Sequence, residues 1–151
     1  MSVNSLGYIV PSSATGWMIT TKYVSSAEFK GAYANPVQIV AAPGAGKRIV
    51  LLLGIVELSY NTTQYQNGGT IGLQFGNTPH AAGTPAAGQI ANTTVNGLTA
   101  SASMGLASGV FLLSSTPQAA TIDQGIYLTN DTAAFTDGDS TFKVLVYHTT
   151  E

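Results

Sequence analysis

Residues 37–75 read VQIVAAPGAGKRIVLLLGIVELSYNTTQYQNGGTIGLQF, and this stretch decides the fold of the chain. It holds three apolar runs separated by two turn-forming clusters that contain Gly, one of them also Pro. The runs are Val37–Ala42, Lys47–Tyr60 and Thr70–Phe75. Val, Ile and Leu favour strands, whereas Pro and Gly end them. The stretch therefore predicts three successive antiparallel strands in a meander.

The longest apolar run of the chain lies in the middle of this stretch. Ile49–Leu53 is apolar at every position, so both faces of this strand are expected to be covered and Leu52→Asp is expected to prevent soluble expression. Arg48 and Glu57 bound a run far shorter than the roughly twenty residues that a membrane-spanning helix needs. The run therefore predicts a core strand of a β-sandwich, and no membrane partner is expected.

The composition limits the classes of function. The 151 residues are enough for one domain. Charged residues make up 8% of the chain, against about a quarter in average soluble proteins, and the net charge is −2. The chain has no basic patch, so a nucleic acid partner is not expected. So weak a charge suits a subunit covered by neighbours in an assembly, although a stable secreted β-protein has the same composition.

The N-terminal region differs from the rest of the chain. Residues 1–24 predict an N-terminal arm, followed by a single β-sandwich domain at residues 25–151. The arm lacks the basic start and the unbroken apolar core of a signal peptide. It also holds more large apolar side chains than a solvated tail would. Aromatic anchors dominate interface energies, so the arm is expected to dock on a partner, the alternative being that it folds over its own domain. The candidate contact residues are Tyr8, Ile9, Trp17, Met18 and Tyr23.

One short helix is predicted immediately after the arm. Ser25 and Glu28 have the spacing of a capping box, in which each side chain hydrogen-bonds the backbone of the other residue. A helix of about two turns through Phe29 and Tyr33 is expected to follow. Pro36 ends it, because the residue before a proline avoids the helical region. We expect this helix to cover an open edge of the sandwich.

The remainder of the chain adds three strands and one long loop. Val110–Leu113, Gly125–Asn130 and Thr141–His148 are predicted strands, the last with apolar residues on one face. Asn77–Ser103 is poor in hydrophobic residues and is predicted to be a long loop without a clear element, either functional or ordered by a neighbour. The fold class expected from all segments together is an all-β, antiparallel, jelly-roll-like β-sandwich.

Three motifs resemble a phosphate-binding loop, a calcium loop or a metal ligand, but each lacks residues that such a site needs. Pro43–Arg48 is not a phosphate-binding loop, because Arg48 stands where Ser or Thr would hold Mg²⁺. Asp137–Asp139 lacks the remaining oxygen ligands of a calcium loop and predicts a turn. His80 has no second ligand nearby in the sequence, and the chain has no cysteine. No catalytic residue, metal or cofactor is therefore expected, and the chain is predicted not to be an enzyme.

Several segments resemble one known family. They are the short helix with the NPV and VAAPGAGKRIV that follow it, then LQFGNT, IYLTND and GDSTFKVLVYH. Over roughly Ser25–His148, the chain resembles the head decoration, or cement, proteins of tailed bacteriophages. The resemblance implies a homotrimer that binds the major capsid protein on the outer surface of the virion.

A second function fits the same sandwich. A phage tail or receptor-binding module that recognises a host-surface carbohydrate would place aromatic rings beside Asp or Asn in its loops. Tyr65 and the loop at Asp131–Asp139 are the best such cluster in this chain. An exposed aromatic ring in that cluster would favour the carbohydrate-binding function over the structural one.

Overall fold

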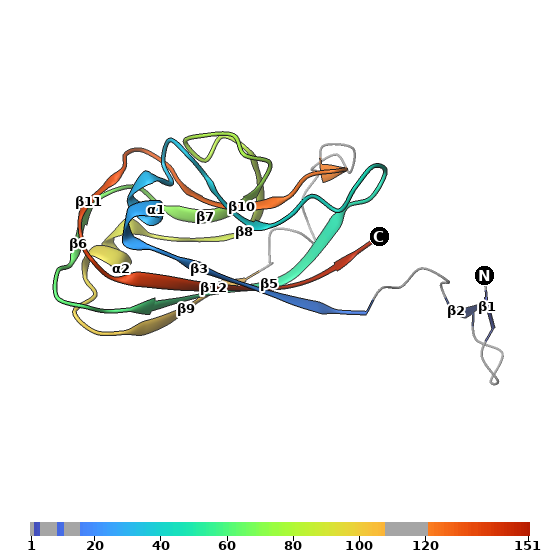
Figure 1. The fold of residues 1–151 in the computed structure, drawn as a ribbon, viewed down its shortest axis with the longest axis horizontal. Helices are drawn as coiled ribbons and strands as arrows, with labels where there is room; N and C mark the ends of the chain where they lie inside the picture. The colour runs from blue at the N-terminus through green and yellow to red at the C-terminus, as the bar shows by residue number, and fades with distance from the viewer. Residues whose placement is uncertain (1, 4–8, 11–15, 108–120) are drawn as a thin grey trace.

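The structure is a computed structural model that describes residues 2–3, 9–10, 16–107 and 121–151. Within these residues, two four-stranded antiparallel sheets pack face to face (Figure 1). This arrangement confirms the predicted all-β antiparallel sandwich. The first sheet has the strand order β3-β12-β5-β9 and the second the order β4-β10-β7-β8.

The described elements are mostly short strands. The strands are β1 (Ser2–Val3), β2 (Ile9–Val10), β3 (Met18–Val24), β4 (Val37–Val40), β5 (Ile49–Ser59), β6 (Tyr65–Asn67), β7 (Ile71–Phe75), β8 (Thr84–Ile90), β9 (Ala102–Ala107), β10 (Ile126–Asn130), β11 (Phe135–Asp137) and β12 (Thr141–Thr150). The helices are α1 (Ser26–Gly31) and α2 (Asn92–Asn96). The predicted strand Val110–Leu113 lies outside the described residues.

The strands predicted as a meander do not pair with one another. β4 and β7 flank β10 in the second sheet, whereas β5 lies between β12 and β9 in the first. β5 and β7 instead face each other across the core, since a Cβ added at Gly54 would lie 2.9 Å from Leu73 Cδ1. The meander prediction is therefore wrong. The three strands β4, β5 and β7 alternate between the two sheets, and β4 and β5 pair only with strands from distant parts of the sequence.

The region predicted as a long loop is also more regular than expected. It contains β8 and α2, so the prediction of an unstructured loop at Asn77–Ser103 is wrong. β8 pairs with β7 and buries Ala86, Ala87 and Ile90. Small side chains carry a weak strand signal, and here the pairing with β7 decides the conformation.

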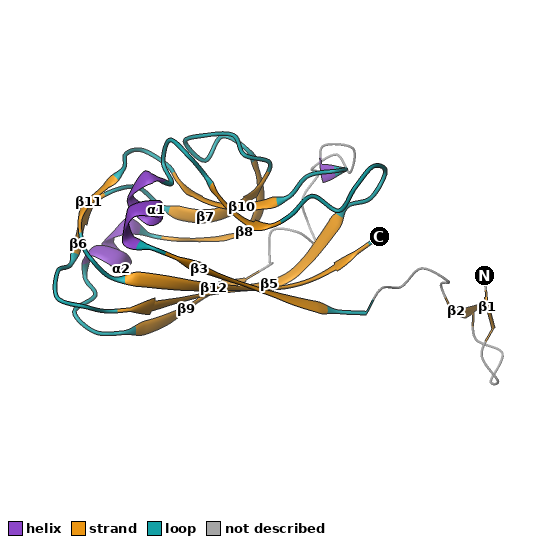
Figure 2. Ribbon diagram, viewed as in Figure 1, coloured by secondary structure: helices purple, strands orange, loops and turns teal. Residues whose placement is uncertain are grey.

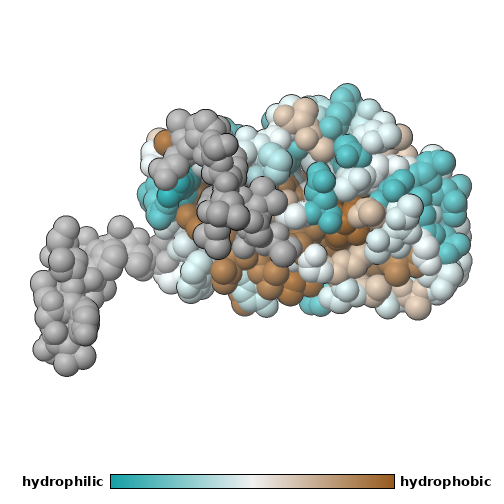
Figure 3. Space-filling model, turned by 180° about the vertical axis from the view of Figure 1, so that it is seen from behind, coloured by the Kyte–Doolittle hydropathy of each residue, from teal (hydrophilic) through white to brown (hydrophobic). Residues whose placement is uncertain are grey.

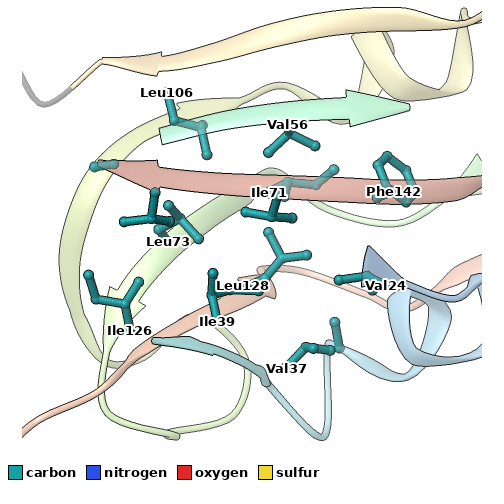
Figure 4. Packing of buried hydrophobic residues seen from close by; sticks show 14 of the residues in the cluster. Val24, Val37, Ile39, Val56, Ile71, Leu73, Leu106, Ile126, Leu128 and Phe142 are labelled. Carbon is teal, nitrogen blue, oxygen red and sulfur yellow. The ribbon is translucent and has the colours of Figure 1, made fainter. Parts of the chain in front are cut away.

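Strand β12 supplies the centre of the first sheet and of the core. Its inward residues, Phe142, Val144 and Val146, are all buried, as the one-sided pattern predicted. They pair in register with Leu58, Val56 and Gly54 of β5. Figure 4 shows Phe142 and Val56 on the inner side of the first sheet, facing Ile71, Leu73, Ile126 and Leu128 of the second sheet.

A β-bulge interrupts the alternation of β5. Tyr147 pairs with Leu53 and His148 with Leu51, which leaves Leu52 as the extra residue. Leu51 is 2% exposed, whereas Leu52 is 50% exposed. The expectation that both faces of Ile49–Leu53 are covered is therefore wrong, because Leu52 is exposed and Leu53 is partly exposed on the outer face.

Two similar loops close one end of the sandwich. Residues 61–68 read NTTQYQNG and residues 131–138 read DTAAFTDG. Each loop leads into a three-residue strand, β6 or β11, and these two strands pair with each other. The sequence therefore contains an internal repeat whose two copies meet in space.

Two glycines make this meeting possible. A Cβ at Gly68 would lie 2.4 Å from the ring of Phe135, and a Cβ at Gly138 would lie 2.2 Å from the ring of Tyr65. Both glycines also have a positive φ, +71° and +63°, which side chains disfavour. The Phe135 ring thus packs on the backbone of Gly68, and the Tyr65 ring packs on the backbone of Gly138.

Helix α1 packs on this closed end (Figure 2). The predicted capping box is present: Ser25 Oγ accepts from the Glu28 amide at 3.2 Å, and Glu28 Oε2 accepts from the Ser25 amide at 2.8 Å. Phe29, 1% exposed, stacks on Phe142 with ring centroids 4.0 Å apart and also contacts the rings of Tyr65 and Phe135. The capping box therefore begins α1, and the buried ring of Phe29 holds the helix against the closed end of the sandwich.

The sheet includes part of the predicted arm. β3 pairs with β12 from Met18↔His148 to Val24↔Phe142, so the sandwich starts at Met18 rather than at Ser25. This pairing satisfies backbone groups of β12 that would otherwise lie at a sheet edge. β1 and β2 pair with each other, apart from the two sheets of the sandwich (Figure 1).

The bulge predicts opposite outcomes for two neighbouring leucines. Leu51→Ala should lower the free energy of unfolding by about 2–5 kcal/mol, because it leaves a cavity in the core. Leu52→Ala, the matched control, should change it by only about 0.5 kcal/mol. Urea unfolding of both variants measures this difference. Equal losses would show that Leu52 is as buried as Leu51.

The closure predicts that Gly138 does not tolerate a side chain. Gly138→Ala should cost roughly 3 kcal/mol, since it combines a left-handed backbone with a clash against the Tyr65 ring. Gly31→Ala is the control, because nothing lies within 4 Å of an added Cβ there, and alanine favours a helix. Thermal unfolding should show a lower Tm for Gly138→Ala alone. A Tm equal to that of the unmodified chain would contradict the proposed packing.

Candidate interaction surfaces

The outer face of the β3-β12-β5-β9 sheet is lined by apolar side chains. Strand register places Tyr147 between Ile19 and Leu53 in one cross-strand row, and Leu145 beside Ile55 in the next. These residues alternate with the buried ones of the same strands, so they point away from the core. We call this surface the apolar sheet face. Its members are Ile19, Tyr23, Leu53, Ile55, Leu145 and Tyr147.

Several of these side chains are open to solvent. Ile19 is 59% exposed and Tyr23 is 72% exposed. Leu53, Ile55, Leu145 and Tyr147 are partly exposed on the central strands. Figure 3 shows hydrophobic residues gathered on the lower side of the molecule, where Figure 1 places this sheet. An apolar sheet face of this kind is typical of an interaction surface.

The charges on the apolar sheet face are paired. Lys143 lies between Tyr23 and Glu57 in the third row, and its Nζ lies 3.0 Å from Glu57 Oε2. The hydrogen bond with Glu57 raises the pKa of Lys143, so the ammonium remains charged at neutral pH. This ion pair contributes no net charge.

The outer face of the second sheet has the opposite character. Gln38, Gln89 and Tyr127 lie on it, and the Gln38 amide donates to the Tyr127 hydroxyl at 3.1 Å. Gln74 is 2% exposed because the following loop folds over it. Its Nε2 donates to the carbonyls of Gly76 and Thr78, at 3.0 and 2.6 Å. One outer face is thus polar and partly covered by its own loop, whereas the other is apolar.

The predicted contact residues do not form one cluster. Tyr8 lies outside the described residues, and Ile9 belongs to β2, where the structure does not describe the side chain. Trp17 is 61% exposed and Met18 39% exposed, and both lie at the start of β3. Tyr23 lies near the other end of that strand. Their role in binding a partner stays a prediction.

Sequence reasoning missed most of the apolar sheet face. Leu53, Ile55, Leu145 and Tyr147 were not among the candidates, because both faces of these strands carry apolar residues. The signal that could have found them is the presence of more apolar positions in β5 and β12 than one buried face requires.

The proposed carbohydrate cluster is structural. Tyr65 is 1% exposed, and its hydroxyl donates to the Ser140 carbonyl at 2.5 Å, so its ring offers no platform for a sugar. Asp131 Oδ1 accepts from the Thr70 amide at 2.7 Å. These residues hold the two repeated loops together.

Asp139 also joins the two repeated loops through hydrogen bonds, and we call these contacts between the loops the clamp. Its carboxylate accepts from the amides of Thr62 and Thr63, at 3.1 and 2.9 Å, and from the Thr62 hydroxyl at 2.6 Å. The hydrogen bonds from the Thr62 side chain and the Thr63 amide lower the pKa of Asp139 to about 2. The carboxylate is therefore ionised at neutral pH and serves as an acceptor for the opposite loop.

Other polar features also have structural explanations. The turn at Pro43–Arg48 leads directly into β5 and not into a helix, as expected for a turn. His80 stacks on the ring of Tyr33 with centroids 4.2 Å apart. An open depression of about 590 Å³ beside β3 and α1 holds Lys22 and Glu28, which pair with each other at 3.3 Å. Among the described residues, no group of three His, Cys, Asp or Glu could hold a metal ion.

None of the described helices is long and apolar enough to cross a membrane. No family model matches the chain, and no curated protein matches it. Among solved structures, the chain is similar to one chain of the cyanophage Pam1 capsid asymmetric unit. The two are 16% identical, with a TM-score of 0.48, and the match covers 98% of this chain and 97% of the other. At this identity and TM-score, no property of that capsid is transferred to this chain.

The clamp predicts a dependence of stability on pH. Because the folded pKa of Asp139 is lowered from 3.8 to about 2, its carboxylate stabilises the fold above about pH 4 and loses this effect as pH falls from 4 to 2. Asp139→Asn should therefore be less stable than the unmodified chain at pH 7, and the difference should shrink between pH 4 and 2. Urea unfolding across this range measures it. A difference that stays constant with pH would contradict the clamp.

Proposed function

We propose that this chain is a structural protein of a tailed-bacteriophage virion, which binds the major capsid protein on the outer surface of the head as a homotrimer. The observation that carries this proposal is the apolar sheet face, which gives a weakly charged sandwich a large surface for assembly. The family resemblance in Ser25–His148 points to the same role.

The arrangement of the polar groups supports a binding role rather than catalysis. Asp131 and Asp139 are occupied in the clamp between the repeated loops. His148 is 4% exposed, its Nε2 lies 2.9 Å from Thr20 Oγ1, and burial lowers the pKa of its imidazole. These groups are committed to the fold, so we propose that the chain is not an enzyme.

The start of β3 is the part of the described chain best suited to contact the capsid. Trp17 is 61% exposed, and it lies where the N-terminal residues join the sandwich. Tryptophan is among the side chains that most often dominate binding energy. We therefore assign Trp17 to the capsid contact, together with the predicted residues that precede it.

A carbohydrate-binding tail module has lost its supporting observation. That function depended on Tyr65 being exposed beside the acidic loop, and Tyr65 is buried. The residues that line the depression near α1 include no aromatic side chain, and stacking on an aromatic ring is what that function required.

The test is binding to phage heads that lack this protein. The purified chain should sediment with such heads, and Trp17→Ala should weaken the binding about tenfold or more. Tyr127→Ala is the control, since Tyr127 lies on the polar outer face of the second sheet, and it should bind normally. Failure of the unmodified chain to sediment with heads, together with binding to host cells, would overturn the proposal.

A further inference from the structure

The capsid contact proposed at Trp17 does not use the apolar sheet face. We propose that this face is the surface through which copies of the chain pack against one another. The inference rests on the self-association in the proposed function and not on the attachment to a capsid, so the two can fail independently.

Leaving the apolar sheet face in water is unfavourable, because leucine and isoleucine side chains are stabilised when a partner removes them from water. Monomeric soluble proteins rarely expose contiguous apolar patches larger than a few hundred Å². The face gathers aliphatic side chains from three adjacent strands, β3, β12 and β5. A partner should therefore cover it in the free protein.

The size of the face also fits an interface. The three strands β3, β12 and β5, about 4.8 Å apart and each about eight residues long at roughly 3.3 Å per residue, give a projected area of roughly 400 Å². Accessible area exceeds projected area where side chains protrude. A standard interface removes about 800 Å² of accessible surface from each partner. The face is thus comparable in size to one side of a stable protein interface.

The charge of the face selects the occupant. The face carries one cation and one anion, Lys143 and Glu57, and they neutralise each other. Copies of the chain that meet at this face experience no net repulsion, and a charged partner finds nothing complementary. Permanent interfaces between identical chains are more apolar than reversible ones.

The second sheet cannot play this role in the same way. Its outer face presents Gln38 and Gln89, and Gln74 holds the loop that covers part of it. Only one side of the sandwich is therefore suited to permanent association. This asymmetry supplies matched controls, because an equivalent substitution can be made on either outer face.

The first experiment measures the molar mass of the free protein by light scattering after size-exclusion chromatography. We expect an oligomer for the unmodified chain, and monomers for Ile55→Lys and Leu145→Lys with cooperative unfolding retained. Gln38→Lys and Gln89→Lys should remain oligomeric. A monomeric unmodified chain at micromolar concentration would overturn the proposal, as would folded oligomers of both lysine variants.

The second experiment stays informative if the lysine variants do not fold. The chain has no cysteine, so one thiol can be placed at will. Ile19 is 59% exposed on the single chain, so Ile19→Cys should react with a maleimide at least tenfold more slowly than Gln89→Cys in the free protein only if a second copy covers it. Equal rates in free protein, with protection of Ile19→Cys only on phage heads, would show that the capsid occupies the face and would overturn the proposal.

Discussion

The antiparallel register between β5 and β12 determines which residues are inside the protein and which are outside. It sets Val144 opposite Val56 and Leu145 opposite Ile55. A slip of one residue would exchange the core with the apolar sheet face. The bulge at Leu52 moves the buried positions of β5 from Ile49 and Leu51 to Gly54, Val56 and Leu58, so that β5 stays in step with the buried residues of β12.

β6 and β11 close one end of the sandwich, and this closed end holds one end of β5 and one end of β12 in place. Gly68 and Gly138 each accept the aromatic ring of the opposite loop, and Asp139 ties the loops through hydrogen bonds to Thr62 and Thr63. α1 enters the same cluster through Phe29. This construction uses the aromatic and acidic residues that could have formed a binding site, and it leaves the flat outer faces as the surfaces available to a partner.

The sequence predicted those features that local patterns encode. The capping box at Ser25 and Glu28 and the one-sided strand at Thr141–His148 are both present, since each depends on neighbouring residues alone. Strand pairing was not predictable in this way, because β4, β5 and β7 find partners far along the chain. Trp17 and Tyr23 were predicted as contact residues because they are large and aromatic. The larger face through Ile55 and Leu145 went unseen, since an apolar residue in a strand does not show which face is buried.

The central claim is our proposal that this chain, bound to phage heads, covers its apolar sheet face with copies of itself. Electron cryomicroscopy of heads that carry this protein tests the claim most directly. We expect clusters of sandwiches on the outer surface, in which Ile55 and Leu145 of each copy lie against a neighbouring copy. Single, separated sandwiches with this face in solvent or pressed on the shell would contradict the account, as would heads without any such density.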